Sequence, residues 1–354
     1  MTARGFRRLL FLVHQYTGFI FAAYLIVVCV SGSILLLLEN QIEGYRDYLM
    51  LRVPVGARTL PLSSVIGVAE DANPGRTIRH VLLSCPSGCT DDVSFDYGSN
   101  RLDVLVDPYT GAILKTVVWE HTAIGMLYGL HGSLFGGDTG ETINAAAGLS
   151  LLVLGCTGLY LWPGWRGLRR GFAVKWPAQP FRFNYDVHKI VGIVSVAFLL
   201  MWALTAAGQV FWPDYPEPIA PVPATTNGTK RLQFDRIVAI GNAVLPGELT
   251  MVYPAREMLV LRKRVPGDPD AYGYSYVALN AATGEVKQVY DARTFPLSWR
   301  VREAMYAVHI GSPGGPILRL LYAVFGLTPA ALFLTAFLMW RSRLKREGAR
   351  RAEG

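Results

Sequence analysis

Charged residues are scarce in this sequence. Only 17% of its 354 residues are Asp, Glu, Lys or Arg, and 51% are hydrophobic, whereas about 25% charged residues is usual in a soluble domain. Four stretches carry no charge at all: residues 9–38, 142–165, 190–213 and 320–340. Each can supply the roughly 20 apolar residues that a helix needs to cross a bilayer. The sequence therefore predicts four transmembrane helices rather than buried helices of a large soluble domain, and the first is too long for a cleaved signal peptide.

Cysteine is also rare, with four in the chain. Cys85 and Cys89 lie in the motif CPSGC, in a region expected outside the cytoplasm, where a disulfide is the favoured interpretation. A redox-active pair or a metal site are alternatives, although no other sulfur ligand lies nearby. Cys29 and Cys156 lie within expected membrane helices, where packing of a small apolar side chain accounts for them.

Acidic residues are missing from three short basic segments. Residues 1–8, 163–189 and 341–354 hold 15 of the 34 Lys and Arg residues and only 3 of the 26 Asp and Glu residues. Basic residues beside membrane helices mark the cytoplasmic side, so both termini and the loop at 163–189 are predicted to be cytoplasmic. The net charge of +8 then reflects membrane topology, with membrane lipid as a partner and no nucleic acid.

This pattern divides the chain into eight segments. They are a first membrane helix (1–38), a first outside α+β module with a histidine-bearing helix (39–140), a second membrane helix (141–162), a cytoplasmic loop (163–186), a third membrane helix (187–212), a second outside module with a histidine-bearing helix (213–316), a fourth membrane helix (317–341) and a basic cytoplasmic tail (342–354). The expected fold is an α-helical four-helix membrane bundle with two α+β modules.

The two halves of the chain repeat each other. Four landmarks recur at a nearly constant offset of 173–178 residues: His14 and His188, Thr110 and Thr283 in strand-turn segments, His131 and His309, and Trp162 and Trp340. Since each half crosses the membrane twice, the repeats share one orientation. We expect an internal two-fold repeat that places His14 beside His188 near the inner face and His131 beside His309 near the outer face.

Histidine at the edge of a membrane segment is costly unless it is paired or functional. Neutral imidazole is a good haem-iron ligand, and two histidines on different helices can fill both axial positions of one iron. We therefore interpret His14 with His188, and His131 with His309, as the axial ligands of two haem b groups. Alternatives are packing residues, a proton relay, for which the spans offer no carboxylates, and zinc or copper transport, which needs further ligands.

Other residues near these histidines have weaker signals. His121 has no histidine counterpart and could be a partner of a haem propionate or an alternative ligand, whereas His80 is expected in a strand or at the surface. Arg300 and Arg302 could bind propionates or an anionic substrate, although a solvated helix face is the favoured interpretation. Four aromatic residues are candidates for substrate contact by position: Trp119, Tyr128, Trp299 and Tyr306.

The chain resembles the PepSY-associated transmembrane family, often described as iron-regulated membrane proteins. The resemblance covers almost the whole chain and rests on HxxxG at 14–18 and 188–192, VDPYTG at 106–111, LNAATG at 279–284, LYGLHGSLFGG at 127–137, MYAVHIGSPGG at 305–315 and GLYLW at 158–162. It implies that the two outside modules are periplasmic PepSY modules. No single motif is specific, but their order and duplication are.

The resemblance implies a bacterial inner-membrane oxidoreductase with two haem b groups that reduces the ferric iron of a siderophore at the periplasmic face. Electrons would enter at His14 and His188 and leave at His131 and His309. The cytoplasmic segments are too short to bind a flavin or nicotinamide, so the donor would be a membrane quinol or a separate cytoplasmic reductase. Competing hypotheses are a PepSY membrane-anchored sensor or inhibitor that binds a protein partner, and a siderophore transporter without redox activity.

Overall fold

The computed structural model describes residues 2–47, 58–83, 90–176, 179–212, 231–255, 257–268 and 272–352. The chain forms two compact units. The helical unit comprises residues 1–37, 127–212 and 308–354, and the sheet unit comprises residues 38–126 and 213–307. Cys85 and Cys89, for which a disulfide was predicted, lie outside the described residues, whereas Cys29 and Cys156 are free thiols on membrane helices.

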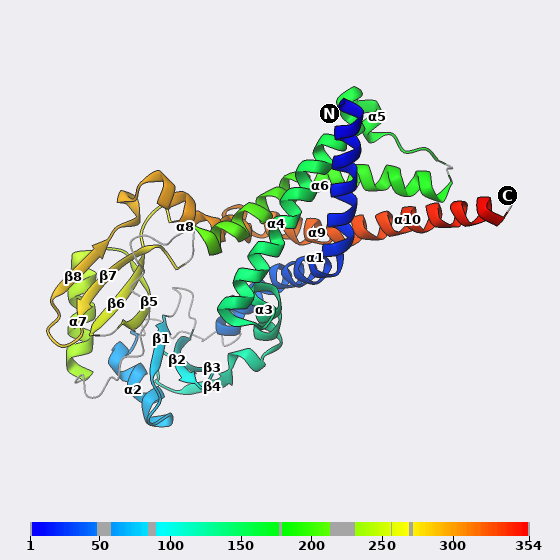
Figure 1. Cartoon of the computed structure of the whole chain (residues 1–354). Helices are drawn as coiled ribbons and strands as arrows, with labels where there is room; N and C mark the ends of the chain where they lie inside the picture. Colours follow the sequence, from blue (N-terminus) through cyan, green and yellow to red (C-terminus); the bar gives the residue numbers. More distant parts are fainter. Residues whose placement is uncertain are drawn as a thin grey trace. The chain divides into compact units, whose positions relative to one another are not determined.

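The helical unit contains the four predicted membrane helices. Four helical segments are long and apolar enough to cross a membrane: Ala3–Leu38, Gly137–Arg166, Pro180–Phe211 and Ser312–Gly348. They belong to α1 (Ala3–Asp47), α4 (Gly137–Leu161), α6 (Pro180–Phe211), and the consecutive helices α9 (Gly315–Gly326) and α10 (Thr328–Ala352) (Figure 1). Helix α6 packs against both α4 and α10. The prediction of four spanning helices is confirmed at this level.

Short helices connect these spans. The histidine-bearing helices are α3 (Ala123–Ser133) and α8 (Leu297–His309). Between α4 and α6 the chain forms η2 (Pro163–Arg166) and α5 (Leu168–Phe172), and η4 (Ser312–Gly314) precedes α9. These elements turn the chain between successive spans.

Several helices differ from their predicted bounds. Helix α1 continues to Asp47, beyond the expected end at residue 38, and α10 continues to Ala352, beyond the expected end at residue 341. Helix α6 begins at Pro180, seven residues before the expected start at residue 187; proline is well suited to a first helical position because it has no N–H to leave unpaired. His188 therefore lies more than two turns inside α6. The last span is broken at Leu327, because Pro329 follows as the second residue of α10 and cannot donate a hydrogen bond to the preceding turn.

The sheet unit contains a single antiparallel sheet. The first half of the chain contributes α2 (Leu62–Ala72), β1 (Ile78–Leu82), β2 (Asp91–Tyr97), β3 (Asn100–Val106), β4 (Ile113–Val118) and η1 (Trp119–His121). The second half contributes α7 (Arg231–Val244), β5 (Glu248–Ala255), β6 (Met258–Arg264), β7 (Ser275–Asn280), β8 (Val286–Tyr290) and η3 (Ala292–Thr294). The strand order is β4-β3-β2-β1-β5-β6-β7-β8. The two predicted α+β modules therefore share one sheet, joined where Val81 of β1 faces Val252 of β5.

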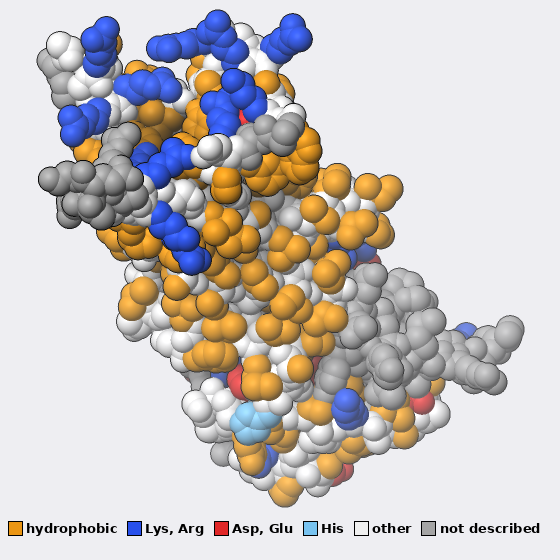
Figure 2. Space-filling view, turned by 90° about the vertical axis from the view of Figure 1, so that its right-hand side faces the viewer, with side chains coloured by type: hydrophobic (Ala, Val, Ile, Leu, Met, Phe, Trp, Pro, Cys, Tyr) orange, Lys and Arg blue, Asp and Glu red, His pale blue; other side chains and the backbone are white. Residues whose placement is uncertain are grey.

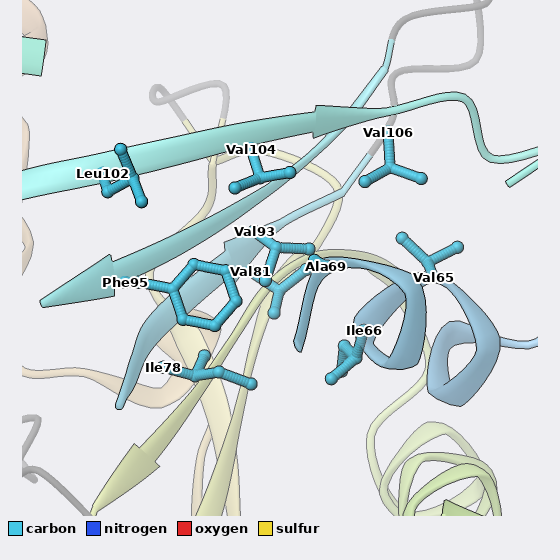
Figure 3. Close-up of a cluster of buried hydrophobic side chains, with 10 residues drawn as sticks. All are labelled: Val65, Ile66, Ala69, Ile78, Val81, Val93, Phe95, Leu102, Val104 and Val106. Carbon is cyan, nitrogen blue, oxygen red and sulfur yellow. The ribbon is translucent and has the colours of Figure 1, made fainter. Parts of the chain in front are cut away.

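Each module has its own hydrophobic core between its helix and its strands. In the first module, Val65 and Ala69 of α2 pack on alternate residues of the strands, among them Val93 and Phe95 of β2 and Val104 of β3 (Figure 3). Alternation arises because successive strand residues point to opposite faces. A second cluster packs α7 against β5, β6 and β7. Helices α2 and α7 are linked on this face by Asp235, which accepts a hydrogen bond of 3.1 Å from the backbone N–H of Ser63.

The surface of the helical unit has a long apolar part and a basic part at one end. Figure 2 shows a face on which hydrophobic side chains cover the length of the helices, while Lys and Arg side chains gather at one end. Large apolar residues are exposed along every span, for example Ile20, at 72% relative exposure, and Leu204, at 55%. Such a surface is unfavourable in water and is suited to lipid.

Candidate functional site

The helical unit brings the four predicted histidines into two pairs. His14 of α1 faces His188 of α6, with ring centroids 6.2 Å apart and ring planes at 82°. His131 of α3 faces His309 of α8, also with centroids 6.2 Å apart and with planes at 52°. We call these the first pair and the second pair. Each pair joins one residue from each half of the chain.

In the first pair, the ring nitrogen Nδ1 is occupied by a hydrogen bond to a neighbouring helix. His14 Nδ1 lies 2.9 Å from Thr157 Oγ1 on α4, and that hydroxyl donates its own proton to the Val153 carbonyl. His188 Nδ1 lies 3.0 Å from Thr335 Oγ1 on α10 and 3.1 Å from the Leu332 carbonyl. Since a carbonyl only accepts, and the threonine proton is already used, Nδ1 must carry the hydrogen. Nε2 is then the unprotonated nitrogen that can bind a metal.

The histidines of the second pair also form their hydrogen bonds through Nδ1. His131 Nδ1 donates to the Val28 carbonyl of α1 at 2.8 Å, with Ser31 Oγ 3.5 Å away. His309 Nδ1 lies 2.8 Å from Thr205 Oγ1 of α6, whose proton goes to the Met201 carbonyl at 2.9 Å. All four rings are thus held in the tautomer that leaves Nε2 free.

The backbone around the second pair is also anchored. His131 lies in the last turn of α3, and Asn144 Nδ2 donates to the carbonyls of His131 and Gly132 at 2.7 and 2.8 Å. His309 ends α8, and Trp202 Nε1 donates to its carbonyl at 3.1 Å. These bonds satisfy carbonyls that a helix end leaves without partners and fix the direction in which each histidine leaves its helix.

Glycines allow the helices to approach these rings closely. A Cβ at Gly32 would lie 2.6 Å from Cε1 of His131, and a Cβ at Gly158 would lie 3.2 Å from Cε1 of His14. Small residues at such contacts are typical of packed membrane helices. The first distance cannot be accommodated without moving the ring.

The two pairs lie at different depths of the helical unit. His14 and Ser31 lie on α1, and His188 and Thr205 lie on α6, with the same separation of seventeen residues in each helix. At a rise of 1.5 Å per residue this is roughly 25 Å, close to the ~30 Å of a bilayer hydrocarbon core. Because Ser31 and Thr205 contact the second pair, the pairs lie toward opposite ends of the apolar spans Ala3–Leu38 and Pro180–Phe211.

A cavity of about 510 Å³ surrounds the first pair. Both histidines line it, together with Gly18 and Gly192, each one turn after its histidine, and with aliphatic and aromatic side chains of α1, α4, α6 and α10. Its volume lies within the roughly 300–1,000 Å³ of small-molecule sites. It is a largely apolar pocket with two imidazoles in its walls.

One end of this cavity is polar. Arg182, Lys189 and Arg343 line it, as does Trp162. Lys189 and Arg182 both bind Asp186, at 2.7 and 3.1 Å. Trp162 is 8% exposed, and within the described parts of the chain its indole Nε1 has no hydrogen-bond partner.

Other predicted residues lie elsewhere. His121, in η1, is exposed, and His80 lies in β1, where its Nε2 is 3.1 Å from Ser94 Oγ; both belong to the sheet unit. Arg300 is exposed and Arg302 is partly buried on α8. Of the aromatic candidates, the structure places Trp119 in η1 with the Arg101 guanidinium 4.8 Å from its ring, and it leaves Tyr128 and Tyr306 exposed and Trp299 partly buried.

The hydrogen-bond partners of the histidines were not identified from the sequence. The sequence carries a signal for them, because Thr157 and Thr335 are separated by 178 residues, and Ser31 and Thr205 by 174, both within the range of offsets that relates the two halves of the chain. Within the described ranges, no group of three or more His, Cys, Asp or Glu side chains could hold a bare metal ion. A metal held by one of these histidine pairs would need further ligands from outside the described residues.

Comparison with known proteins places the chain in a family. No curated protein matches the sequence. The sequence model described as "PepSY-associated TM region" matches residues 11–343, which include all four paired histidines and both modules of the sheet. The chain therefore belongs to the PepSY-associated transmembrane family, as its motifs predicted.

Proposed function

We propose that this protein is a di-haem b oxidoreductase of the bacterial inner membrane that reduces ferric iron, bound to a siderophore, at the periplasmic face. The observation that carries the proposal is the presence of two facing histidine pairs, each with ring centroids 6.2 Å apart, in one helical unit.

The spacing supports a metal between the rings. With a metal–nitrogen bond of about 2 Å on each side, two axial imidazoles have centroids roughly 6 Å apart. Direct ring packing alone would not require Nδ1 to be engaged in all four histidines. The consistent use of Nδ1 for hydrogen bonds is the arrangement that orients ligating histidines and raises their basicity.

The cavity around the first pair supports a porphyrin in particular. Its apolar walls suit a flat macrocycle, and Gly18 and Gly192 leave room beside the ligating side chains. The cationic end formed by Arg182, Lys189 and Arg343 suits the carboxylates that a porphyrin carries. His14 and His188 would hold one haem, and His131 and His309 the other.

Haem bound by two histidines supplies a one-electron carrier with no open coordination site. The residues of this chain would then have three roles. The histidines would bind the iron, and the hydroxyl and carbonyl groups that accept hydrogen bonds from Nδ1 would tune how strongly the histidines bind it. The apolar walls of the cavity would exclude water. The ferric substrate would gain its electron at the periplasmic face. Candidate contacts are the aromatic residues Trp119, Tyr128, Trp299 and Tyr306.

The topology we propose follows from the duplication. The two halves would share one orientation, with both termini and the basic loop between α4 and α6 in the cytoplasm and the sheet unit in the periplasm. Matching contacts in the two halves support the duplication: Thr157 serves His14 as Thr335 serves His188. The first pair would then receive electrons from a quinol or a cytoplasmic reductase.

The substrate and the reaction rest on the resemblance to iron-uptake proteins of this family. Reducing Fe³⁺ to Fe²⁺ takes one electron and weakens binding to hard oxygen ligands, so iron can leave a siderophore. The proposed redox role differs from a protein-binding sensor or a siderophore transporter in requiring haem.

The test is pyridine haemochrome quantitation of the protein purified in detergent after expression with ample haem precursor. We expect two haem b per chain, and one in His14→Ala or in His131→Ala. His80→Ala and His121→Ala are matched controls and should keep two. A colourless wild-type protein would refute the proposal and favour the sensor or the transporter.

A second measurement tests the reaction itself. Reduced protein mixed with a ferric siderophore should be reoxidised while Fe²⁺ appears in a ferrous chelator assay. His131→Ala should block this step more than His14→Ala, since the second pair lies nearer the proposed acceptor. Two haems without such reoxidation would support electron transfer to another acceptor.

A further inference from the structure

The positively charged residues at the polar end of the first-pair cavity all come from one half of the chain. Arg182 and Lys189 come from α6 and Arg343 from α10, both in the second half of the chain. At the offset of the repeat, the first half has Gln15 opposite Lys189 and Trp165 opposite Arg343. The counterpart of Arg182 is Arg8, which does not line the cavity. Among the described residues, the Lys and Arg side chains that line the cavity all belong to the second half.

Not all of these cations are available to a ligand. Lys189 is buried, and its Nζ donates to Asp186 at 2.7 Å and to the carbonyls of Ala173 and Arg170 at 2.7 and 3.1 Å. These three bonds use all three of its donors. Lys189 therefore holds α5 against α6 and is not free to bind an anion.

The two arginines have unused donors. Arg182 uses Nε for Asp186, which leaves its two terminal nitrogens, and its side chain is 44% exposed. Arg343 is exposed and makes no hydrogen bond or ion pair in the part of the chain that the structure describes. Guanidinium groups are well matched to carboxylates because their donors form a planar fork.

A buried donor lies in the wall of the same cavity. Among the residues that the structure describes, the indole Nε1 of Trp162 is buried without a hydrogen-bond partner, and leaving a buried donor unsatisfied is unfavourable. Packing fixes this ring, because Gly164 and Gly171 lie so close that a Cβ at either would be 2.1 or 2.4 Å from it. A ligand acceptor that reaches Nε1 from the cavity would satisfy this donor.

The charges match a dianion. Arg182, Lys189 and Arg343 carry three positive charges and Asp186 one negative charge, which leaves two positive charges at this end. We infer that Arg343, Arg182 and the indole N–H of Trp162 bind the two carboxylates of the porphyrin and so fix its orientation between His14 and His188. This inference rests on the proposed function and assigns anchoring residues to one of its two sites.

The test compares two probes in the protein carrying His131→Ala, which isolates the first pair. Protein made under haem limitation is titrated with haem b and with haem b dimethyl ester, which lacks both carboxylates, and binding is followed by Soret absorbance. We expect haem b to bind at least about tenfold more tightly than the ester, because charge-assisted hydrogen bonds are lost with the ester.

The variants then assign the anchor. Arg343→Leu should remove most of the preference for haem b while leaving affinity for the ester unchanged, and Trp162→Phe should reduce it less. Arg341→Leu, an exposed arginine on the same helix that does not line the cavity, is the matched control and should keep the full preference.

The outcomes separate the two proposals. Equal binding of both probes, or equal weakening of both by Arg343→Leu, would overturn the carboxylate anchor while leaving two-histidine ligation intact. Failure of both probes to bind would overturn the proposed function itself, and the anchor with it.

Discussion

The paired histidines differ in how many acceptors hold each ring. His188 Nδ1 has both a threonine hydroxyl and a backbone carbonyl within 3.1 Å, whereas among the described residues His309 Nδ1 has the Thr205 hydroxyl alone. A hydroxyl can be removed by mutation and a backbone carbonyl cannot. The four histidines should therefore differ in how strongly they respond to replacement of the hydroxyl residue that accepts their hydrogen bond.

Replacing Thr205 by valine should loosen haem at the second pair. Valine keeps the shape and removes the acceptor, and such outer partners are typically worth about 10–100-fold in affinity. Thr335→Val should have a much smaller effect at the first pair, because the Leu332 carbonyl remains. Haem retention during gel filtration and redox titration of each haem measure the effect; equal losses in both variants would contradict it.

Gly32→Ala should displace His131. The new methyl would lie 2.6 Å from the ring carbon Cε1, so the ring or helix α1 must move. We expect one haem per chain, with the first pair unaffected, measured by pyridine haemochrome. The matched control is Gly148→Ala, where the nearest atom would be 3.8 Å away; two haems in both variants would show that the second pair tolerates the shift.

At the scale of elements, the sequence predicted the strand-turn units because each carries its own local signals. In the first, Asp107 accepts from the backbone N–H of Tyr109 at 2.8 Å; in the second, Asn280 accepts from that of Ala282 at 2.9 Å. Gly111 and Gly284 both adopt φ of 76°, which favours glycine. Side-chain caps and glycine act over a few residues and can be recognised without the rest of the fold.

The joining of the modules into one sheet was not predicted. It depends on pairing β1 with β5, strands about 170 residues apart, through Val81 with Val252 and Leu82 with Met251. The edge of a strand presents backbone groups that any other strand edge can pair with. The sequence of a strand therefore does not identify the strand with which it pairs. The break between α9 and α10 was not predicted. Residues 320–340 carry no charge and are predominantly apolar, and this pattern predicts one continuous helix despite Pro329.

Phe95→Ala should destabilise the sheet unit by about 3–5 kcal/mol, the usual cost of removing a buried aromatic side chain. Phe95 is fully buried in the first core. The control is Tyr97→Ala in the same strand, which is 39% exposed and should cost much less. Thermal denaturation in detergent, monitored by circular dichroism, tests this; equal losses of stability would argue against a core role for Phe95.

At the scale of the whole molecule, we propose that charge decides the orientation in the membrane. The basic segments flank the spans, and the positive-inside rule predicts that they lie in the cytoplasm. A C-terminal fusion to green fluorescent protein should fluoresce, and one to alkaline phosphatase should be inactive. A phosphatase fusion truncated after residue 212 should be active. The reverse pattern would invert the proposed topology and move the first pair to the outer face.

The sequence by itself determined the four apolar spans, and it predicted the two modules and a duplication that relates His14 to His188 and His131 to His309, because these depend on composition and on spacing along the chain. Only the tertiary structure decided that each pair faces across 6.2 Å, which hydroxyl or carbonyl holds each Nδ1, and that Arg182, Arg343 and Trp162 share one cavity. Those contacts join helices more than a hundred residues apart, and packing between distant helices leaves no local mark on the sequence.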